Sequence, residues 1–295
     1  MDFFLQQLIN GLSLGSIYAL IALGYTMVYG IILLINFAHG DILMAGAYAA
    51  FYVLGFFGVT PLGVAAAFIF AMGFCGMLGA AIERFAYRPL RDSPRLNSLI
   101  TAIAISLILQ NAARLIPFIG PNPRQFPRPD VKLISAAGFS ISNIQIIVIF
   151  VSAFLMIVLN YIINKTKRGR AMRAVSYDAK AASLMGVNVD GVISFTFALG
   201  SMLAACGGIL YAFSYPQISP AMGAMPGLKA FIAAVIGGIG SIPGAMLGGV
   251  LLGLTETFTK SVNSQYADAI SFSLLIIMLL VRPSGIMGSK LKVKV

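Results

Sequence analysis

KTKRGRAMRAVSYDAKAASLMGVNVDG, residues 165–191, is a basic, polar stretch in a chain of 295 residues of which 59% are hydrophobic and only 10% are charged. Soluble domains carry about 25% charged residues, whereas apolar runs of roughly 20 residues are typical of membrane-spanning helices. Such runs lie on both sides of residues 165–191 and recur along the chain. The sequence therefore predicts an all-α integral membrane protein, a polytopic helical bundle of about eight spans with interrupted helices, forming a single domain over residues 1–295.

The stretch 165–191 has the pattern of one amphipathic helix, which we expect over residues 169–186. Its apolar residues recur at steps of three and four, so they share one side of a helix while most basic residues lie elsewhere. Gly186 is expected to end this helix. Two interpretations stay open: a solvated loop that only fixes topology, or a helix that docks on a cytoplasmic partner. The docking interpretation involves Arg170, Met172, Val175, Ala179, Ala181, Ala182, Met185 and Gly186.

The distribution of basic residues predicts how the chain is oriented in the membrane. Short loops rich in Lys and Arg stay in the cytoplasm, and residues 83–97 and 165–191 are two such loops, separated by two spans. We therefore expect both loops in the cytoplasm, with the proline-rich connection 120–143 and the N-terminus outside. The same placement accounts for the formal net charge of +11 without a nucleic-acid partner.

The C-terminal part of the chain fits this orientation only if one apolar stretch is interrupted. With simple crossings Lys290, Lys292 and Lys294 fall outside, against the rule for basic residues. Residues 227–258 contain a Gly- and Pro-rich break at 236–244. We therefore expect this stretch to enter the membrane and return as two short helices that meet at the break.

A second interruption, residues 36–41 (NFAHGD), lies near the start of the chain. Interrupted spans free backbone groups to meet a polar substrate, so both breaks are candidates for a central pathway. Other roles stay open: Asp41 can cap the next helix, and Asn36 and His39 can hydrogen-bond within the bundle. One His without a second ligand makes no metal site. The candidate pathway residues are Asn36, His39, Asp41, Gly237, Gly238 and Gly240.

The sequence carries no recognisable catalytic motif. It has no GxxxxGK[ST] phosphate loop, so we do not expect the chain to hydrolyse ATP by itself, and it has no HExxH segment. Cys75 and Cys206 lie in apolar runs and are expected to pack as small residues without a disulfide. We therefore expect a transport subunit rather than an enzyme, with no metal and no cofactor.

Four segments together resemble a known family of permeases. They are GLSLGSIYALIALGY (11–25), NFAHGD (36–41), AASLMG (181–186) and AFIAAVIGGIGS (230–241). They look like the permeases of the bacterial high-affinity branched-chain amino acid importer, most of all the first, H-type, of its two permease subunits. The loop segment is also similar to the AAxxxG core by which ATP-binding-cassette (ABC) importers dock on their ATPase, although Lys180 stands where many such loops have Glu.

The resemblance implies a function and a set of partners. It implies a permease of the bacterial inner membrane that forms, with a second homologous permease subunit, the pathway for leucine, isoleucine and valine. A periplasmic binding protein is then expected to deliver the substrate, and two cytoplasmic ATP-binding subunits are expected to act on the docking loop 165–191. The permease itself is expected to lie in membrane lipid. Related permeases carry urea, amides or other amino acids, and a stand-alone channel or secondary transporter is the competing class.

Overall fold

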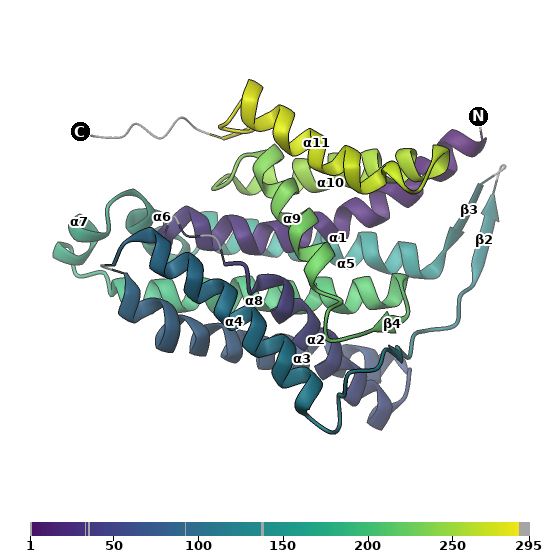
Figure 1. Cartoon of the computed structure of the whole chain (residues 1–295), viewed down its shortest axis with the longest axis horizontal. Coiled ribbons are helices and arrows are strands. Elements are labelled where there is room, and N and C mark those ends of the chain that lie inside the picture. The colour runs from purple at the N-terminus through teal and green to yellow at the C-terminus, as the bar shows by residue number, and fades with distance from the viewer. Residues whose placement is uncertain (1, 33, 35, 92, 137–138, 289–295) are drawn as a thin grey trace.

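The structure is a computed structural model that describes residues 2–288 except residues 33, 35, 92, 137 and 138. In this part of the chain it is a bundle of helices with two short two-stranded sheets (Figure 1). The helices are α1 (Asp2–Ile32), α2 (His39–Phe57), α3 (Pro61–Ile82), α4 (Arg95–Leu115), α5 (Asn143–Lys165), α6 (Lys167–Tyr177), α7 (Ala179–Leu184), α8 (Val189–Ser214), α9 (Ala224–Gly237), α10 (Ile242–Val262) and α11 (Tyr266–Val281). Short π-helical and 3-10 turns occupy Glu83–Tyr87 and Arg88–Leu90, and the strands are β1 (Arg124–Gln125), β2 (Leu133–Ala136), β3 (Phe139–Ser142) and β4 (Gln217–Ile218).

Length and apolar composition decide which helices can cross a membrane, because a span needs about 20 residues. Within the described residues, seven helices are long and apolar enough: α1, α2, α3, α4, α5, α8 and α10. α9 and α11 are apolar but shorter, with 14 and 16 residues. The structure agrees with the predicted polytopic bundle that contains interrupted helices.

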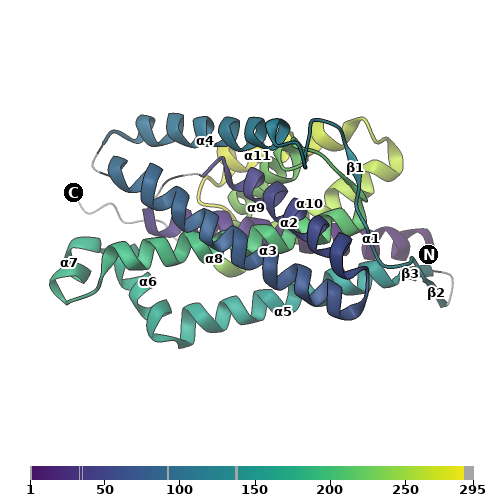
Figure 2. The ribbon, with the colours of Figure 1, turned by 90° about the horizontal axis from the view of Figure 1, so that it is seen from below.

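The two basic loops lie at the same end of the bundle, which we call the basic end. Arg88 and Arg91 of the first loop both form ion pairs with Asp190, which lies near the end of the second loop, in the first turn of α8. At the opposite end, the hairpin end, the Gln6 side chain of α1 exchanges hydrogen bonds of 3.0 and 2.9 Å with the backbone of Ser140 in β3. Figure 2 shows α6 and α7 at one end and the β2–β3 hairpin beside the start of α1 at the other. The prediction that both basic loops share one side, opposite the N-terminus, is confirmed.

Helices α1–α3 and α8–α10 repeat one packing pattern in opposite directions. α1 packs along α10 and α8 packs along α3, while α2 packs on α3 and α9 packs on α10. α1 runs from the hairpin end to the basic end, and α8 runs back from the basic end (Figure 1). Inverted repeats of this kind are typical of membrane transporters.

The core of the bundle lies along α1 and α8. Ile17 and Leu20 of α1 are fully buried, as is Ile209 of α8. Because lipid is as apolar as these side chains, close packing rather than transfer from water holds the two helices together. α4, by contrast, lies along one edge of the bundle and exposes apolar side chains such as Ile100 and Leu107 (Figure 2).

The apolar stretch 227–258 forms two helices that meet at a break, as predicted. α9 ends at Gly237 and α10 begins at Ile242. The break lies at the basic end, where Gly240 and Met172 of α6 line one small cavity. With 21 residues, α10 is longer than the short helix predicted and can span a membrane. The lysines that motivated this prediction, Lys290, Lys292 and Lys294, lie outside the described residues.

The connection 120–143 is more ordered than the extended loop that its prolines predict. β2 and β3 pair as an antiparallel hairpin within it. β1 pairs with β4, so that Arg124 lies opposite Ile218. The second pairing ties the connection to the segment that leads from α8 into α9.

Candidate functional site

The first interruption ends in a turn that Asn36 holds in place. The side-chain oxygen of Asn36 accepts hydrogen bonds from the Ala38 N–H (3.1 Å) and the Tyr87 hydroxyl (3.0 Å). Its backbone carbonyl accepts from the His39 N–H (3.0 Å), the first residue of α2. Asn36 is 3% exposed. Both its acceptor oxygens are therefore used to shape the turn from which α2 starts.

The starts of α2 and α9 touch each other through two glycines. A methyl group added to Gly40 or to Gly223 would collide with the backbone carbonyl of the other residue. Only residues without a side chain allow two backbones to approach this closely. The N-terminal ends of two helices, each with the positive end of its dipole, therefore meet inside the bundle.

A cavity of about 270 Å³ lies beside this contact. Its wall combines the first turns of α2 and α9 with side chains of two kinds, polar groups and aromatic rings. They are Asp41, Ser106 and Gln110, and Tyr25, Phe37 and Phe231. The Phe231 ring centroid lies 6.1 Å from that of Tyr25 and 6.3 Å from that of Phe37, so the rings form one apolar wall.

Asp41 is the charged group of this cavity. The prediction that it caps α2 is wrong, because the helix begins two residues earlier at His39 and Ala38 occupies the capping position. Asp41 instead lies in the first turn, is 2% exposed, and accepts a hydrogen bond of 2.9 Å from the Gln110 amide of α4. The sequence therefore does not predict the contact between Asp41 and Gln110.

His39 is buried beside the cavity but does not line it. Its ring lies against Gly24 of α1 and its centroid is 4.5 Å from that of Tyr25. The side chain is 1% exposed, and its Nε2 has no hydrogen-bond partner among the described residues. His39 thus fills the space that Gly24 leaves in the packing of α1 on α2.

The predicted glycines of the second break lie elsewhere. Gly238 and Gly240 adopt positive φ angles of 108° and 93° between α9 and α10. The segment after α11 covers this break: the Met287 N–H donates to the Gly237 carbonyl (2.9 Å). The structure therefore does not bring residues 36–41 together with Gly237–Gly240, because the second break is at the basic end.

The segment that does meet residues 36–41 is the approach to α9. The sequence shows residues 214–226 only as an uncharged connection with three prolines. Its one additional signal is the spacing of Gly223 and Gly227, which brings small residues to one face of a helix start and suits close packing. Both glycines contact Gly40.

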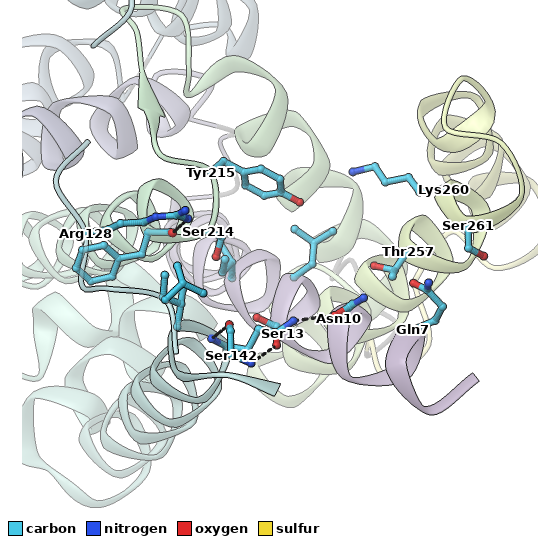
Figure 3. A pocket seen from close by; sticks show the side chains of 16 residues that line it. Gln7, Asn10, Ser13, Arg128, Ser142, Ser214, Tyr215, Thr257, Lys260 and Ser261 are labelled. Carbon is cyan, nitrogen blue, oxygen red and sulfur yellow. Dashed lines mark hydrogen bonds between the residues drawn. The ribbon is translucent and has the colours of Figure 1, made fainter. Parts of the chain in front are cut away.

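A second cavity, of about 490 Å³, lies at the hairpin end between α1, α5, α8 and α10 (Figure 3). Figure 3 shows Tyr215 and Lys260 pointing toward each other across it. Its cations are already engaged: Arg128 donates to the Phe213 carbonyl (3.2 Å), and Lys260 pairs with Glu256 (2.6 Å). The cavity is therefore a polar opening whose charged side chains are bonded to other groups of the protein.

Glu256 is the centre of a charged cluster behind this opening. Its carboxylate, 1% exposed, accepts from the Tyr18 hydroxyl (2.9 Å) and pairs with Lys229 (2.8 Å) and Lys260. Lys229 also pairs with Asp268 (2.7 Å). Two lysines and two acids thus balance each other and join α1, α9, α10 and α11. Paired in this way, charges at membrane depth are tolerated.

The basic loop contains two helices, not the single helix predicted over 169–186. The chain becomes extended at Asp178, with φ −157°, and the Asp178 side chain accepts from the Ala181 N–H (2.9 Å). Asp favours such capping positions over helix interiors because its carboxylate satisfies free N–H groups. α7 is therefore a separate helix that does not continue along the axis of α6 (Figure 1).

The split changes which of the predicted docking residues face outward. The buried residues are Met172 and Val175 of α6 and Ala182 of α7, so these three pack within the chain. The exposed residues are Arg170, Ala179, Ala181, Met185 and Gly186. Leu184, which the sequence interpretation does not include, is 89% exposed, and Met185 is 84% exposed. The apolar tip of α7 therefore projects from the basic end.

Gly186 ends α7 as predicted. Its φ is 80°, and its N–H donates to the Ser183 carbonyl (2.9 Å), while the Val187 N–H donates to the Ala182 carbonyl (3.0 Å). These two bonds form a Schellman motif, which fixes the end of a helix. The tip formed by Leu184 and Met185 is thus held by the backbone of the turn that follows it.

Comparison with known proteins assigns the chain to a family. Residues 7–279 match the permease component of the branched-chain amino acid transport system. The chain is 46% identical to the high-affinity branched-chain amino acid transport system permease protein BraD of Pseudomonas aeruginosa, over 97% of this chain and 96% of that protein. It is 45% identical, over the same shares, to the corresponding protein LivH of Escherichia coli. It is also 26% identical to the permease protein LivM of Escherichia coli, over 93% of this chain and 68% of LivM.

Proposed function

The chain belongs to the permease family of branched-chain amino acid transport systems, and we propose that it is an inner-membrane permease subunit of an ABC importer for leucine, isoleucine and valine. It is a multi-pass membrane protein, with seven helices long enough to span among the residues described. The relatives are transport permeases rather than enzymes. In this proposal the whole chain is one permease domain, and separate subunits hydrolyse ATP.

The observation that supports an ATP-driven importer is the exposed tip of α7. Leu184 and Met185 are large apolar side chains that are almost fully exposed at the end that the basic residues assign to the cytoplasm. An exposed apolar tip on a rigid turn suits docking in a groove of a partner protein. We propose that the loop 165–191 is the coupling loop and that its partner is an ATP-binding subunit.

Movement of this loop has a direct route into the bundle. The Ser176 hydroxyl of α6 donates to the Gly30 carbonyl of α1, and the Arg173 guanidinium donates to the Ile163 carbonyl of α5. α1 in turn packs on α8, α9 and α10. ATP-driven closure of two ATPases on two such loops would therefore shift the helices around the Gly40–Gly223 contact. Without ligand, the inward-open and outward-open states differ in free energy. This difference sets how far substrate binding and ATP must shift the equilibrium between them.

A second permease subunit is the expected neighbour within the membrane. The similarity to LivM, a second permease of a branched-chain amino acid system, supports a pair of homologous subunits. We propose that the two permeases enclose the pathway and that a periplasmic binding protein delivers the amino acid to their outer face.

Reconstitution tests this function. The chain is purified with a second permease and ATP-binding subunits, placed in proteoliposomes, and supplied with a leucine-loaded binding protein. Uptake of leucine, isoleucine and valine that requires both ATP and the binding protein is the expected result. Uptake of urea or amides instead would correct the substrate, and uptake driven by an ion gradient without ATPase subunits would establish a stand-alone transporter.

A further inference from the structure

We propose that the cavity beside the Gly40–Gly223 contact is a substrate site at the centre of the membrane, and that Asp41 binds the ammonium group of the amino acid there. The inference rests on the proposed function, because it names the part of the substrate that one residue recognises. It is carried by three features of the described structure: an uncompensated acid, an apolar wall and an adjustable helix.

The first feature is that Asp41 has no positively charged partner. None of the ion pairs among the described residues includes it. The Gln110 amide satisfies a hydrogen bond but supplies no charge, and the first turn of α2 supplies only the partial charge of a helix end. A carboxylate at membrane depth is costly unless a cation or water compensates it, and acids left without a partner inside a bundle commonly mark a substrate or ion pathway.

The contrast with Glu256 makes this observation specific. Both acids are almost fully buried, with 2% and 1% of their surfaces exposed. Glu256 is paired with two lysines. Asp41 faces a cavity instead. Within one bundle, therefore, one buried acid is neutralised by the protein and the other is left for a ligand.

The second feature is the chemistry of the remaining wall. The rings of Tyr25, Phe37 and Phe231 and the aliphatic side chains of Ile103 and Leu228 line the same space. Aromatic faces attract an alkylammonium group and also pack against branched aliphatic chains. The volume of about 270 Å³ lies just below the range of drug-sized ligand sites, which begins at about 300 Å³, and so suits a single small molecule.

The third feature is that α4, which supplies Ser106 and Gln110, is loosely packed. It lies along one edge of the bundle (Figure 2) and exposes most of its apolar surface. The Gln110–Asp41 hydrogen bond is one of its links to α2. An ammonium group can replace this amide as the partner of Asp41 without disturbing the core along α1 and α8.

Direct binding to the purified complex in lipid nanodiscs, without ATP or binding protein, tests the site. The probes are leucine, 3-methylbutylamine (leucine without its carboxylate) and 4-methylpentanoate (leucine without its ammonium group). Asp41→Asn keeps the shape and the acceptor for Gln110 but removes the charge. We expect it to weaken binding of leucine and of the amine by about tenfold or more, since hydrogen bonds to charged groups are the stronger ones. Binding of 4-methylpentanoate, which has no ammonium group, should not weaken.

Matched variants separate a binding role from a structural one. Asp130→Asn removes an exposed acid from the outer connection and should leave binding and uptake unchanged. Ser106→Phe fills the cavity from α4 and should abolish uptake, whereas Leu107→Phe, at a 54% exposed neighbouring position, should not. If the Asp41→Asn complex fails to assemble, uptake by Ser106→Phe is compared with uptake by Leu107→Phe. This comparison shows whether the cavity lies on the substrate pathway.

The possible results distinguish this site from the proposed function. Wild-type complex that takes up no branched-chain amino acid contradicts the proposed function itself. Wild-type uptake together with unchanged leucine and amine binding in Asp41→Asn overturns the ammonium site, because a neutral structural carboxyl is replaced by Asn without loss. Equal uptake by Ser106→Phe and Leu107→Phe removes the cavity from the pathway.

Discussion

At the scale of single residues, the buried charges of this protein divide into paired and unpaired groups. Lys229 and Glu256 form a direct pair in the interior, and the Tyr18 hydroxyl and Asp268 complete the cluster. Each partner lowers the cost of holding the other away from water. Such a cluster ties helices together only as long as it stays neutral. Removing one charge therefore tests its structural role.

We predict that Glu256→Gln destabilises the bundle by about 1–3 kcal/mol. Breaking a buried pair costs about 3–5 kcal/mol, but Asp268 remains to compensate Lys229. Lys260→Gln should cost only about 0–1 kcal/mol, because the Lys260 side chain is 40% exposed. Thermal unfolding in detergent can be followed with a thiol-reactive dye, since Cys75 and Cys206 are free and buried. Equal melting temperatures for the two variants would contradict a structural role for the cluster.

At the scale of elements, the two helices of the basic loop have separate roles. α6 turns its apolar side inward through Met172 and Val175, and hydrogen-bonds to α1 and α5. α7 presents its apolar end outward and is fixed by Asp178 before it and Gly186 after it. α6 therefore anchors the loop, and α7 offers the surface that a partner can reach.

We predict that Leu184→Arg prevents the ATP-binding subunit from copurifying while the permease still inserts at normal levels. An unpaired charge buried in a docking groove costs several kcal/mol, but the side chain is 89% exposed in the free chain. Val262→Arg is the matched control, because Val262 has the same exposure but lies at the hairpin end of α10. Retention of the ATPase by Leu184→Arg would leave the loop as a topology signal only.

At the scale of the whole molecule, the distribution of charge predicts which end faces the cytoplasm. The ion pairs of Arg88 and Arg91 with Asp190 join the two basic loops at one end. The hydrogen bonds between Gln6 and Ser140 hold the start of α1 to the hairpin at the other. The structure shows which segments lie at each end of the bundle. The rule for basic residues predicts which of these ends faces the cytoplasm.

We predict that a cysteine at Met185 reacts with a membrane-impermeant thiol reagent only from the cytoplasm. A cysteine at Asn122 should react only from outside, because this exposed residue precedes β1 in the outer connection. The native Cys75 and Cys206 are buried and should stay silent in intact cells. The reverse pattern of labelling would invert the orientation and remove α7 from reach of a cytoplasmic partner.

The sequence predicts the elements of this fold better than their meeting points. Long apolar runs determine where the spans lie, and the Gly/Pro-rich break at 236–244 correctly separates two helices. The contact between Gly40 and Gly223 joins residues far apart in the chain, and the spacing of Gly223 and Gly227 predicts close packing there but does not identify the start of α2 as the partner. Gln110 cannot be matched to Asp41 for the same reason, because hydrogen bonds between helices depend on packing that no local pattern encodes.

Local competition explains the remaining differences. The apolar spacing over 169–186 is right for a helix, but the side chain of Asp178 captures a free N–H and starts a second helix there. Asp41 follows Gly40 as a capping residue would, yet the turn held by Asn36 starts α2 earlier. In both cases a short polar side chain, rather than the apolar pattern, sets the helix boundary.

Two halves that share one packing pattern but run in opposite directions need not have the same shape at any one moment. If α1–α3 took the present shape of α8–α10, and α8–α10 the shape of α1–α3, the molecule would face the other side of the membrane. We therefore expect the opposite-facing state to resemble this structure with the shapes of its two halves exchanged. The starts of α2 and α9, which hold equivalent places in the two halves, touch at Gly40 and Gly223. Such an exchange would change the side that the protein faces without requiring a second fold.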